Sequence, residues 1–287
     1  MTAVIIPVYN GADVLPLTVP AVLAQQGIDQ IIWVDDGSSD ATTAMLREAT
    51  QADARVRVVR LSENRGRSAA RNAGVAACDS DTLVFFDADV EPQSDASAAL
   101  TRALESPGAV ASVARFEPVL TEPYEPYQNY AAHFSRGPAL GTVATAPIDW
   151  RFFLTGACAM RREDLATAGG FREDIAYGED VALGCALTAR APQGLRLAST
   201  CVRLHDVGTL ERAVRNAEAY GRGLRNLRAD CPSLTARFDR LRVLAPAARA
   251  LTSVLRRLID RLPPGETRRR CVRYLLGLSV LRAYPRA

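Results

Sequence analysis

The stretch Thr82-Leu-Val-Phe-Phe-Asp-Ala-Asp89 decides how the rest of the chain is interpreted. Its first five residues are apolar or β-prone and are bounded by polar residues, which is typical of a buried strand. The strand ends in Asp87 and Asp89, and alternate side chains of an extended segment point the same way, so both carboxylates can face one ligand. Hard oxygen donors of this kind suit Mg²⁺ or Mn²⁺. The stretch therefore predicts either a divalent-metal site or a solvated loop, and its neighbours must decide.

Three earlier segments repeat the order of strand, polar turn and helix. We expect strands at residues 2–8, 30–34 and 56–61, and helices at residues 14–26, 41–52 and 68–77. Alternating strands and helices of this length predict an α/β fold with a single, mainly parallel, Rossmann-like sheet and helices on both faces.

The polar clusters of this half all follow predicted strands. They are Val8-Tyr9-Asn10, Asp35-Asp36, residues 64–71 and Asp87-Ala-Asp89. Ligands of parallel sheets gather at the carboxyl ends of the strands, so all four clusters should lie on one edge. A solvated edge explains any one cluster, whereas their coincidence indicates a site.

The second half of the chain is less regular. Residues 115–150 are rich in Tyr and Pro and predict an excursion or lid, after which residues 152–160 and 194–204 read as strands. Gly178-Glu179-Asp180 begins a helix that runs to about residue 190. We expect a domain at residues 1–208, with halves at 1–115 and 116–208, and a basic helical extension at residues 209–287.

Composition excludes several classes of protein. With 287 residues, of which 48% are hydrophobic and 23% charged, the chain can bury a large core. All its basic residues are Arg, so lysine Schiff-base chemistry is excluded. The six cysteines form no C-x-x-C pair and sit in apolar surroundings, which favours reduced thiols, no zinc site and a cytoplasmic location. A strand-like start at Thr2 leaves no room for a secretory signal, and we expect no spanning helix.

Residues 237–287 contain far more Arg than Asp and Glu. Two interpretations stay open. These helices either dock on the core with a solvated basic face, or they attract the anionic inner surface of a membrane.

The ordered motifs together resemble family 2 glycosyltransferases of the GT-A fold. The resemblance spans residues 2–206 and rests on Ile6-Pro-Val-Tyr-Asn10, Val34-Asp-Asp-Gly-Ser-Ser-Asp40, Asn64-Arg-Gly-Arg-Ser-Ala-Ala-Arg-Asn-Ala-Gly74, Asp87-Ala-Asp89 and Gly178-Glu-Asp180. It implies an inverting enzyme that moves a sugar from a nucleotide sugar, with UDP-sugars favoured, to an acceptor hydroxyl. The half at 1–115 would bind the nucleotide sugar and the half at 116–208 the acceptor.

The resemblance also implies roles for individual residues. Tyr9 would pack on the base, Asp36 would accept a base N–H, and Arg71 would lie near the pyrophosphate. Asp35 would serve the ribose, and Asp87 would contact either the ribose or a metal-bound water. The positions implied to bind the nucleotide are therefore Pro7, Tyr9, Asp35, Asp36, Arg71 and Asp87.

The resemblance also implies which residues bind the metal ion and which residue acts as the general base. Asp89 would hold Mn²⁺ or Mg²⁺, which stabilises the leaving diphosphate, and His205 would be a further ligand. Asp180 would be the general base that takes the acceptor's proton. Alternatively, Glu179 and Asp180 only place favourable charge in the first turn of their helix.

Two other functions remain open. A sugar nucleotidyltransferase would also use carboxylate-bound Mg²⁺, but it should carry a Gly-rich basic loop where this chain has Pro7-Val-Tyr-Asn10. The second of these other functions is that of a non-catalytic nucleotide-sugar-binding protein. The expected partners are a nucleotide sugar and an acceptor, which is a glycan, a lipid-linked molecule or a small molecule. Whether the chain forms a homo-oligomer stays open, and no binding to nucleic acid is expected.

Overall fold

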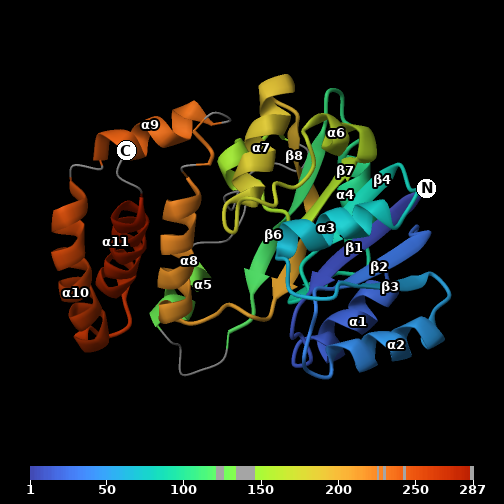
Figure 1. The fold of residues 1–287 in the computed structure, drawn as a ribbon, viewed down its shortest axis with the longest axis horizontal. Helices are drawn as coiled ribbons and strands as arrows, with labels where there is room; N and C mark the ends of the chain where they lie inside the picture. The colour runs from blue at the N-terminus through green and yellow to red at the C-terminus, as the bar shows by residue number, and fades with distance from the viewer. Residues whose placement is uncertain (121–125, 134–145, 225, 229–230, 242–243, 285–287) are drawn as a thin grey trace. The chain divides into compact units, whose positions relative to one another are not determined.

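The computed structural model describes residues 1–120, 126–133, 146–224, 226–228, 231–241 and 244–284. Within them, eight strands form one sheet in the order β3-β2-β1-β4-β7-β6-β8-β5 (Figure 1). The strands are β1 (Thr2–Val8), β2 (Gln30–Asp35), β3 (Val56–Arg60), β4 (Thr82–Phe86), β5 (Val90–Pro92), β6 (Ala111–Pro118), β7 (Ala157–Arg161) and β8 (Leu195–Leu204). The helices of this part are α1 (Leu15–Leu23), α2 (Thr42–Ala52), α3 (Arg67–Ala76), α4 (Ala96–Ala103), the 3₁₀ turn η1 (Trp150–Phe152), α6 (Arg162–Thr167) and α7 (Glu179–Arg190).

Helices cover both faces of the sheet, and the alternation of side chains along β1 shows why. Val4 and Ile6 belong to a core cluster with residues of α1, α2 and α4, whereas Ala3 and Ile5 belong to a second cluster with residues of α3, α6 and α7. Successive residues of a strand point to opposite faces, so a strand that is apolar throughout is buried on both. All residues from Ala3 to Val8 are buried.

The first half of the sheet is parallel, as the sequence predicts. β1 pairs in parallel with β2 and β4, and β2 pairs in parallel with β3. The α/β class with helices on both faces is therefore confirmed. Antiparallel pairs occur in the second half of this mainly parallel sheet, where β7 runs antiparallel to β4 and β6, and β5 antiparallel to β8.

The remaining helices belong to a separate compact unit. This second unit comprises residues 118–134, 174–178 and 207–287, and the first comprises residues 1–117, 135–173 and 179–206. Its helices are α5 (Pro126–His133), α8 (Leu210–Gly223), α9 (Pro232–Leu241), α10 (Ala245–Arg261) and α11 (Glu266–Ala283). Leu210, Val214, Ile259, Val272 and Leu275 form its core. The helical character predicted for the end of the chain is present.

Three further expectations can be compared with the structure. The expected excursion at residues 115–150 contains the end of β6 and α5, and its residues 121–125 and 134–145 lie outside the described residues. No helix in the described part of the chain combines the length and apolar composition that crossing a membrane requires. Cys78, Cys158, Cys201 and Cys271 are free thiols.

Candidate active site

A cavity of about 500 Å³ opens at the carboxyl ends of β1, β4 and β8. Its lining consists of Pro7, Val8, Tyr9, Asn10, Gly11, Asp13, Val14, Ala88, Asp89, His205 and Asp206. Four residues that the sequence singled out, Pro7, Tyr9, Asp89 and His205, therefore meet here. Among the described residues, Asp35, Asp36, Arg71, Asp87 and Asp180 lie outside this lining.

The loop after β1 presents Tyr9 to this cavity. Asn10 adopts a left-handed backbone with φ 48°, which Asn tolerates better than most residues. Its side-chain oxygen accepts a hydrogen bond from Ser39 N at 2.9 Å, and its own N–H donates to Ser38 Oγ at 2.9 Å. The turn is thereby anchored to the loop after β2, while the Tyr9 side chain stays 49% exposed. An exposed aromatic beside a polar cavity is suited to stacking on a planar ligand.

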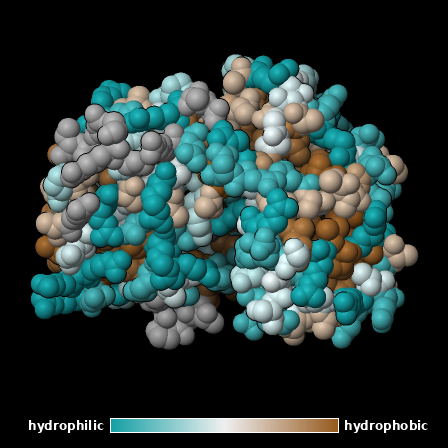
Figure 2. Space-filling model, viewed as in Figure 1, coloured by the Kyte–Doolittle hydropathy of each residue, from teal (hydrophilic) through white to brown (hydrophobic). Residues whose placement is uncertain are grey.

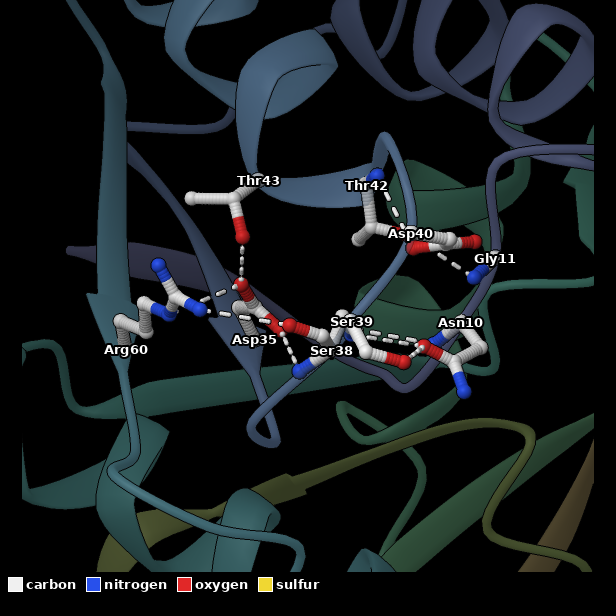
Figure 3. A network of polar contacts seen from close by, with 9 residues as sticks. All are labelled: Asn10, Gly11, Asp35, Ser38, Ser39, Asp40, Thr42, Thr43 and Arg60. Atoms are coloured by element: carbon white, nitrogen blue, oxygen red, sulfur yellow. Dashed lines mark hydrogen bonds and ion pairs between the residues drawn. The ribbon is translucent and has the colours of Figure 1, made fainter.

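Asp35 organises that second loop rather than the cavity (Figure 3). One of its carboxylate oxygens accepts from Ser38 N at 2.8 Å, and the other accepts from Thr43 Oγ1 and lies 3.6 Å from Arg60 Nε. Burial would raise the pKa of Asp35, but these hydrogen bonds and the Arg60 charge lower it below its ordinary value. The side chain is fully buried, so its observed contacts are with the protein.

Asp36 is similarly committed to the backbone of the next loop. Its two oxygens accept hydrogen bonds from Arg65 N at 2.8 Å and Gly66 N at 2.9 Å. These contacts fix the segment that leads into α3. Gly37 is required beside them, because a Cβ there would lie 2.6 Å from the carbonyl carbon of Glu63.

Arg71 joins the Asp87-Ala-Asp89 stretch to the start of α7. Its Nη2 donates to Asp87 Oδ1 at 2.6 Å and its Nη1 to Glu179 Oε1 at 3.3 Å, and its guanidinium lies over the Phe171 ring at 5.4 Å. Arg67 Nε lies 3.4 Å from the same Glu179 oxygen. Arg71 is only 1% exposed, so its charge is placed to hold carboxylates within the protein.

Gly156 gives Asp87 the space that this ion pair needs. Asp87 N donates to the Gly156 carbonyl at 2.9 Å. A Cβ on Gly156 would lie 2.5 Å from Asp87 Oδ2, which is closer than real atoms approach. Any larger residue at position 156 must displace the Asp87 carboxylate.

Asp89 and His205 are brought together by the pairing of β5 with β8. His205 N donates to the Asp89 carbonyl at 2.9 Å, and His205 Nε2 lies 2.6 Å from Glu91 Oε2. No group of three or more metal-ligating side chains is preformed among the described residues. Asp89, His205 and Asp206 nevertheless line one cavity, and carboxylate and imidazole groups are donor types that divalent cations accept.

Asp180 has the electrostatics of a proton acceptor. Burial, and then the neighbouring Glu179 charge, raise the pKa of Asp180 from 3.8 to about 7, although Arg67 and Arg71 oppose the shift. Its Oδ1 accepts from Val181 N at 2.7 Å at the start of α7. A carboxyl with a pKa near neutrality is suited to general acid–base work.

Sequence reasoning overlooked Glu91 and Gly156 as parts of this site, and it included Asn10 only as a member of the Val8-Tyr9-Asn10 cluster. Glu91 could have been found, because it continues the two-residue spacing of Asp87 and Asp89. Asn10 carries a weaker signal, since Asn in a turn after a strand often adopts a left-handed backbone. Nothing local marks Gly156, whose role depends on a carboxylate 69 positions earlier.

Comparison with known proteins identifies relatives over part of this chain. The family model described as "Glycosyl transferase family 2" matches residues 3–168. The pre-mycofactocin glycosyltransferase of Mycobacterium tuberculosis is 32% identical over 212 residues, which are 71% of this chain and 42% of that protein. The succinoglycan biosynthesis protein ExoO of Rhizobium meliloti is 34% identical over 110 residues, covering 38% of this chain and 31% of that protein. The chain thus spans less than half the length of these relatives.

Solved structures share its fold. The mannosyltransferase PcManGT from Pyrobaculum calidifontis, in complex with GDP-Man and Mn²⁺, superposes with a TM-score of 0.61 at 19% identity and covers 98% of this chain and 86% of that one. Residues 1–349 of TarS from S. aureus, in complex with UDP-GlcNAc, superpose with a TM-score of 0.57 at 14% identity, covering 98% and 89%. At these identities the likeness shows the fold, which is the GT-A fold expected from the motifs. The chain belongs to glycosyl transferase family 2.

Proposed function

We propose that this chain is an inverting glycosyltransferase that moves a sugar from a nucleotide-sugar donor, with UDP-sugars favoured, to an acceptor hydroxyl. The observation that carries the proposal is the convergence of Tyr9, Asp89 and His205 on one cavity at the carboxyl ends of β1, β4 and β8. An aromatic surface for a base and metal-ligating groups for a diphosphate are the two features that a nucleotide sugar requires. Membership of family 2 supports the same chemistry.

The donor would bind with its base on Pro7 and Tyr9 and its ribose near Asp87. Asp35 and Asp36 would act chiefly by holding the loops around the base, since their oxygens already accept protein N–H and O–H groups. The buried Arg71 would act by holding Asp87, and this placement favours a positioning role over direct contact with the pyrophosphate.

Asp89 and His205 would hold Mn²⁺ or Mg²⁺. When bound, the cation supplies positive charge beside the leaving diphosphate as a Lewis acid. A solved structure of the same fold contains Mn²⁺ with GDP-Man, which supports a divalent cation in this fold. Glu91 would orient the His205 ring through its contact with Nε2.

Asp180 would take the proton from the acceptor. As the acceptor oxygen forms its bond to the anomeric carbon, the carboxylate accepts the hydroxyl proton and the bond to the diphosphate breaks on the opposite face. One displacement inverts the anomeric centre. The raised pKa means that Asp180 carries its charge only above about pH 7.

The acceptor is either lipid-linked or soluble. One relative, 38% identical over 96 residues, is the undecaprenyl-phosphate 4-deoxy-4-formamido-L-arabinose transferase of Klebsiella pneumoniae, and its name contains a lipid phosphate. That relative is matched over 31% of this chain and 29% of its own length. We include a lipid-linked acceptor in the proposal for this reason. We also propose that residues 1–208 form the catalytic part, that residues 209–287 form an extension, and that the protein is cytoplasmic.

A thermal-shift screen tests the proposal. UDP, GDP, dTDP and their sugar derivatives are each added with Mn²⁺, Mg²⁺ or EDTA, because a ligand that binds only the native state raises the midpoint of unfolding. We expect a nucleoside diphosphate to stabilise the chain with a divalent cation and to lose that effect in EDTA. Stabilising donors then enter transfer assays with soluble and lipid-linked acceptors.

Three results would contradict the proposal. Absence of stabilisation by every nucleotide would remove the donor site. Release of pyrophosphate from a nucleoside triphosphate and a sugar phosphate would indicate a nucleotidyltransferase. Tight binding without hydrolysis or transfer would indicate a binding protein.

A further inference from the structure

An exposed apolar row runs along α10. It consists of Leu244, Ala247, Leu251, Val254 and Leu258, which recur at spacings of three and four residues and therefore share one face of the helix. Leu244, Leu251, Val254 and Leu258 are 51%, 49%, 51% and 41% exposed. Single exposed apolar residues are ordinary, but a continuous row along one helix marks an interaction surface.

This row is not the face by which α10 packs in its own unit. The packed face consists of Ala248, Thr252 and Ile259, which are at most 2% exposed. Ile259 contributes to the core of the helical unit. Since α10 already buries one apolar face, the row is a second one, and tan and brown residues accordingly interrupt the hydrophilic surface along α10 in Figure 2.

The part of the chain that contains the row is rich in positive charge. Residues 237–287 contain 13 Arg and 3 Asp or Glu, which leaves 22 basic and 29 acidic residues in residues 1–236. On α10 itself, Arg257 and Arg261 are exposed and follow Val254 and Leu258 by three residues each, so they border the row. Long arginine side chains beside an apolar face allow the guanidinium to contact anionic groups while the methylene stem lies against apolar surface.

We propose that α10 binds the surface of a membrane that contains anionic phospholipids, with the row of Leu244 to Leu258 in the interface and Arg257 and Arg261 on the headgroups. The charge of the arginines favours a lipid surface over a second copy of the chain as the partner of this row. A second copy of this helix would bring like charges together, whereas an anionic lipid surface complements them. An apolar face beside basic residues is the pattern of a helix that lies in the membrane interface. The inference does not rest on the transfer reaction.

Vesicle sedimentation of the full chain tests the inference. Vesicles of phosphatidylcholine alone are compared with equal parts of phosphatidylcholine and phosphatidylglycerol, in low and high salt. We expect binding to the anionic vesicles only, weakened by salt because screening shortens the reach of the charges. Leu251→Ser should reduce this binding roughly tenfold, since one large apolar side chain no longer enters the interface.

Matched variants separate this surface from general effects. Leu17→Ser changes a leucine on α1 that is also 49% exposed, and it should leave vesicle binding unchanged. Arg257→Gln with Arg261→Gln should weaken binding roughly tenfold, whereas Arg47→Gln with Arg102→Gln, which are exposed on α2 and α4, should not.

Several outcomes would overturn the inference. These are a lack of binding to anionic vesicles, equal binding to neutral ones, or equal losses in test and control variants. Light scattering can give a further contradicting outcome. If the parent is a dimer that does not bind vesicles and Leu251→Ser is a monomer, the row joins two copies of the chain. Transfer to a soluble acceptor is measured separately, so a failure here is distinguishable from a failure of the proposed function.

Discussion

Arg71 Nη2 lies 2.6 Å from Asp87 Oδ1, which joins α3 to the end of β4. The same guanidinium reaches Glu179, the residue before the proposed base. A buried cation between two carboxylates satisfies charges that would otherwise repel each other. The proposed donor site and the start of α7 are therefore connected through one side chain, and removing it should affect both.

Arg71→Lys tests that connection. An ammonium group lacks the planar fork that contacts two carboxylates at once, so the buried charges lose part of their pairing. We expect the free energy of unfolding, measured in urea, to fall by about 3 kcal/mol. Arg65→Lys is the control, because Arg65 pairs with Glu173 at the surface, where such pairs contribute at most about 1 kcal/mol. Equal effects would show that the Arg71 contacts are not stabilising.

Asp180→Asn should slow transfer and change the pH dependence of stability. The native chain holds the Asp180 proton up to about pH 7, whereas the ordinary pKa is 3.8. The stability that this carboxyl contributes is therefore full below pH 3.8 and is lost as the pH rises to about 7. The variant should unfold at a higher temperature than the parent above pH 7, and the difference should vanish at low pH.

Activity of the parent should rise with pH through about 7, because the base must be ionised, and the variant should lose roughly 100-fold in kcat. Asp81→Asn serves as the control, since that side chain is 88% exposed. A flat pH profile in the parent would argue against Asp180 as the base.

Gly156→Ala should impair donor use without removing any polar group. The added Cβ would lie 2.5 Å from Asp87 Oδ2, so the carboxylate must move. A displacement of about 1 Å near the reacting groups lowers the rate roughly 100-fold. Gly277→Ala is the matched control, because a Cβ there meets nothing within 4 Å. Initial rates over a range of donor concentrations check the prediction, and equal rates in the two variants would contradict it.

Asp89→Asn should remove metal-dependent binding of the nucleoside diphosphate. We expect stabilisation by nucleotide with Mn²⁺ to disappear and transfer to fall roughly 100-fold. Asp13→Asn changes another acidic residue of the same cavity and should retain the metal response. Persistence of the response in Asp89→Asn would exclude this residue as a ligand.

Glu91→Gln addresses the contact between Glu91 and the His205 ring. The amide cannot hold the imidazole as the carboxylate does at 2.6 Å, so the Mn²⁺ concentration for half-maximal activity should rise roughly tenfold. Arg203→Gln is the control, because Arg203 contacts Glu91 at 3.6 Å without contacting the ring in any described bond. An unchanged metal requirement would leave Glu91 without this role.

Local sequence patterns were sufficient for the parallel half of the fold. The predicted strands at residues 2–8, 30–34, 56–61 and 82–86 agree with β1 to β4 to within one residue. Their β-branched, apolar runs are buried on both faces, which is a strong signal. β5 and β6 were missed, because β5 has three residues including Pro92, and the Ser and Arg of β6 interrupt its apolar pattern. Pairing with β8 and β7 makes these segments strands.

The sequence by itself determined the family, the shared edge of the polar clusters and the start of α7 at Glu179-Asp180. Spacing is enough for these, because strand order and periodicity decide which side chains reach the same edge. Only the tertiary structure decided that Arg71 is buried between Asp87 and Glu179, which are 16 and 108 residues away along the chain. Likewise, only packing showed which face of α10 is covered and which is exposed. Such pairings depend on contacts between distant segments, and no local pattern encodes them.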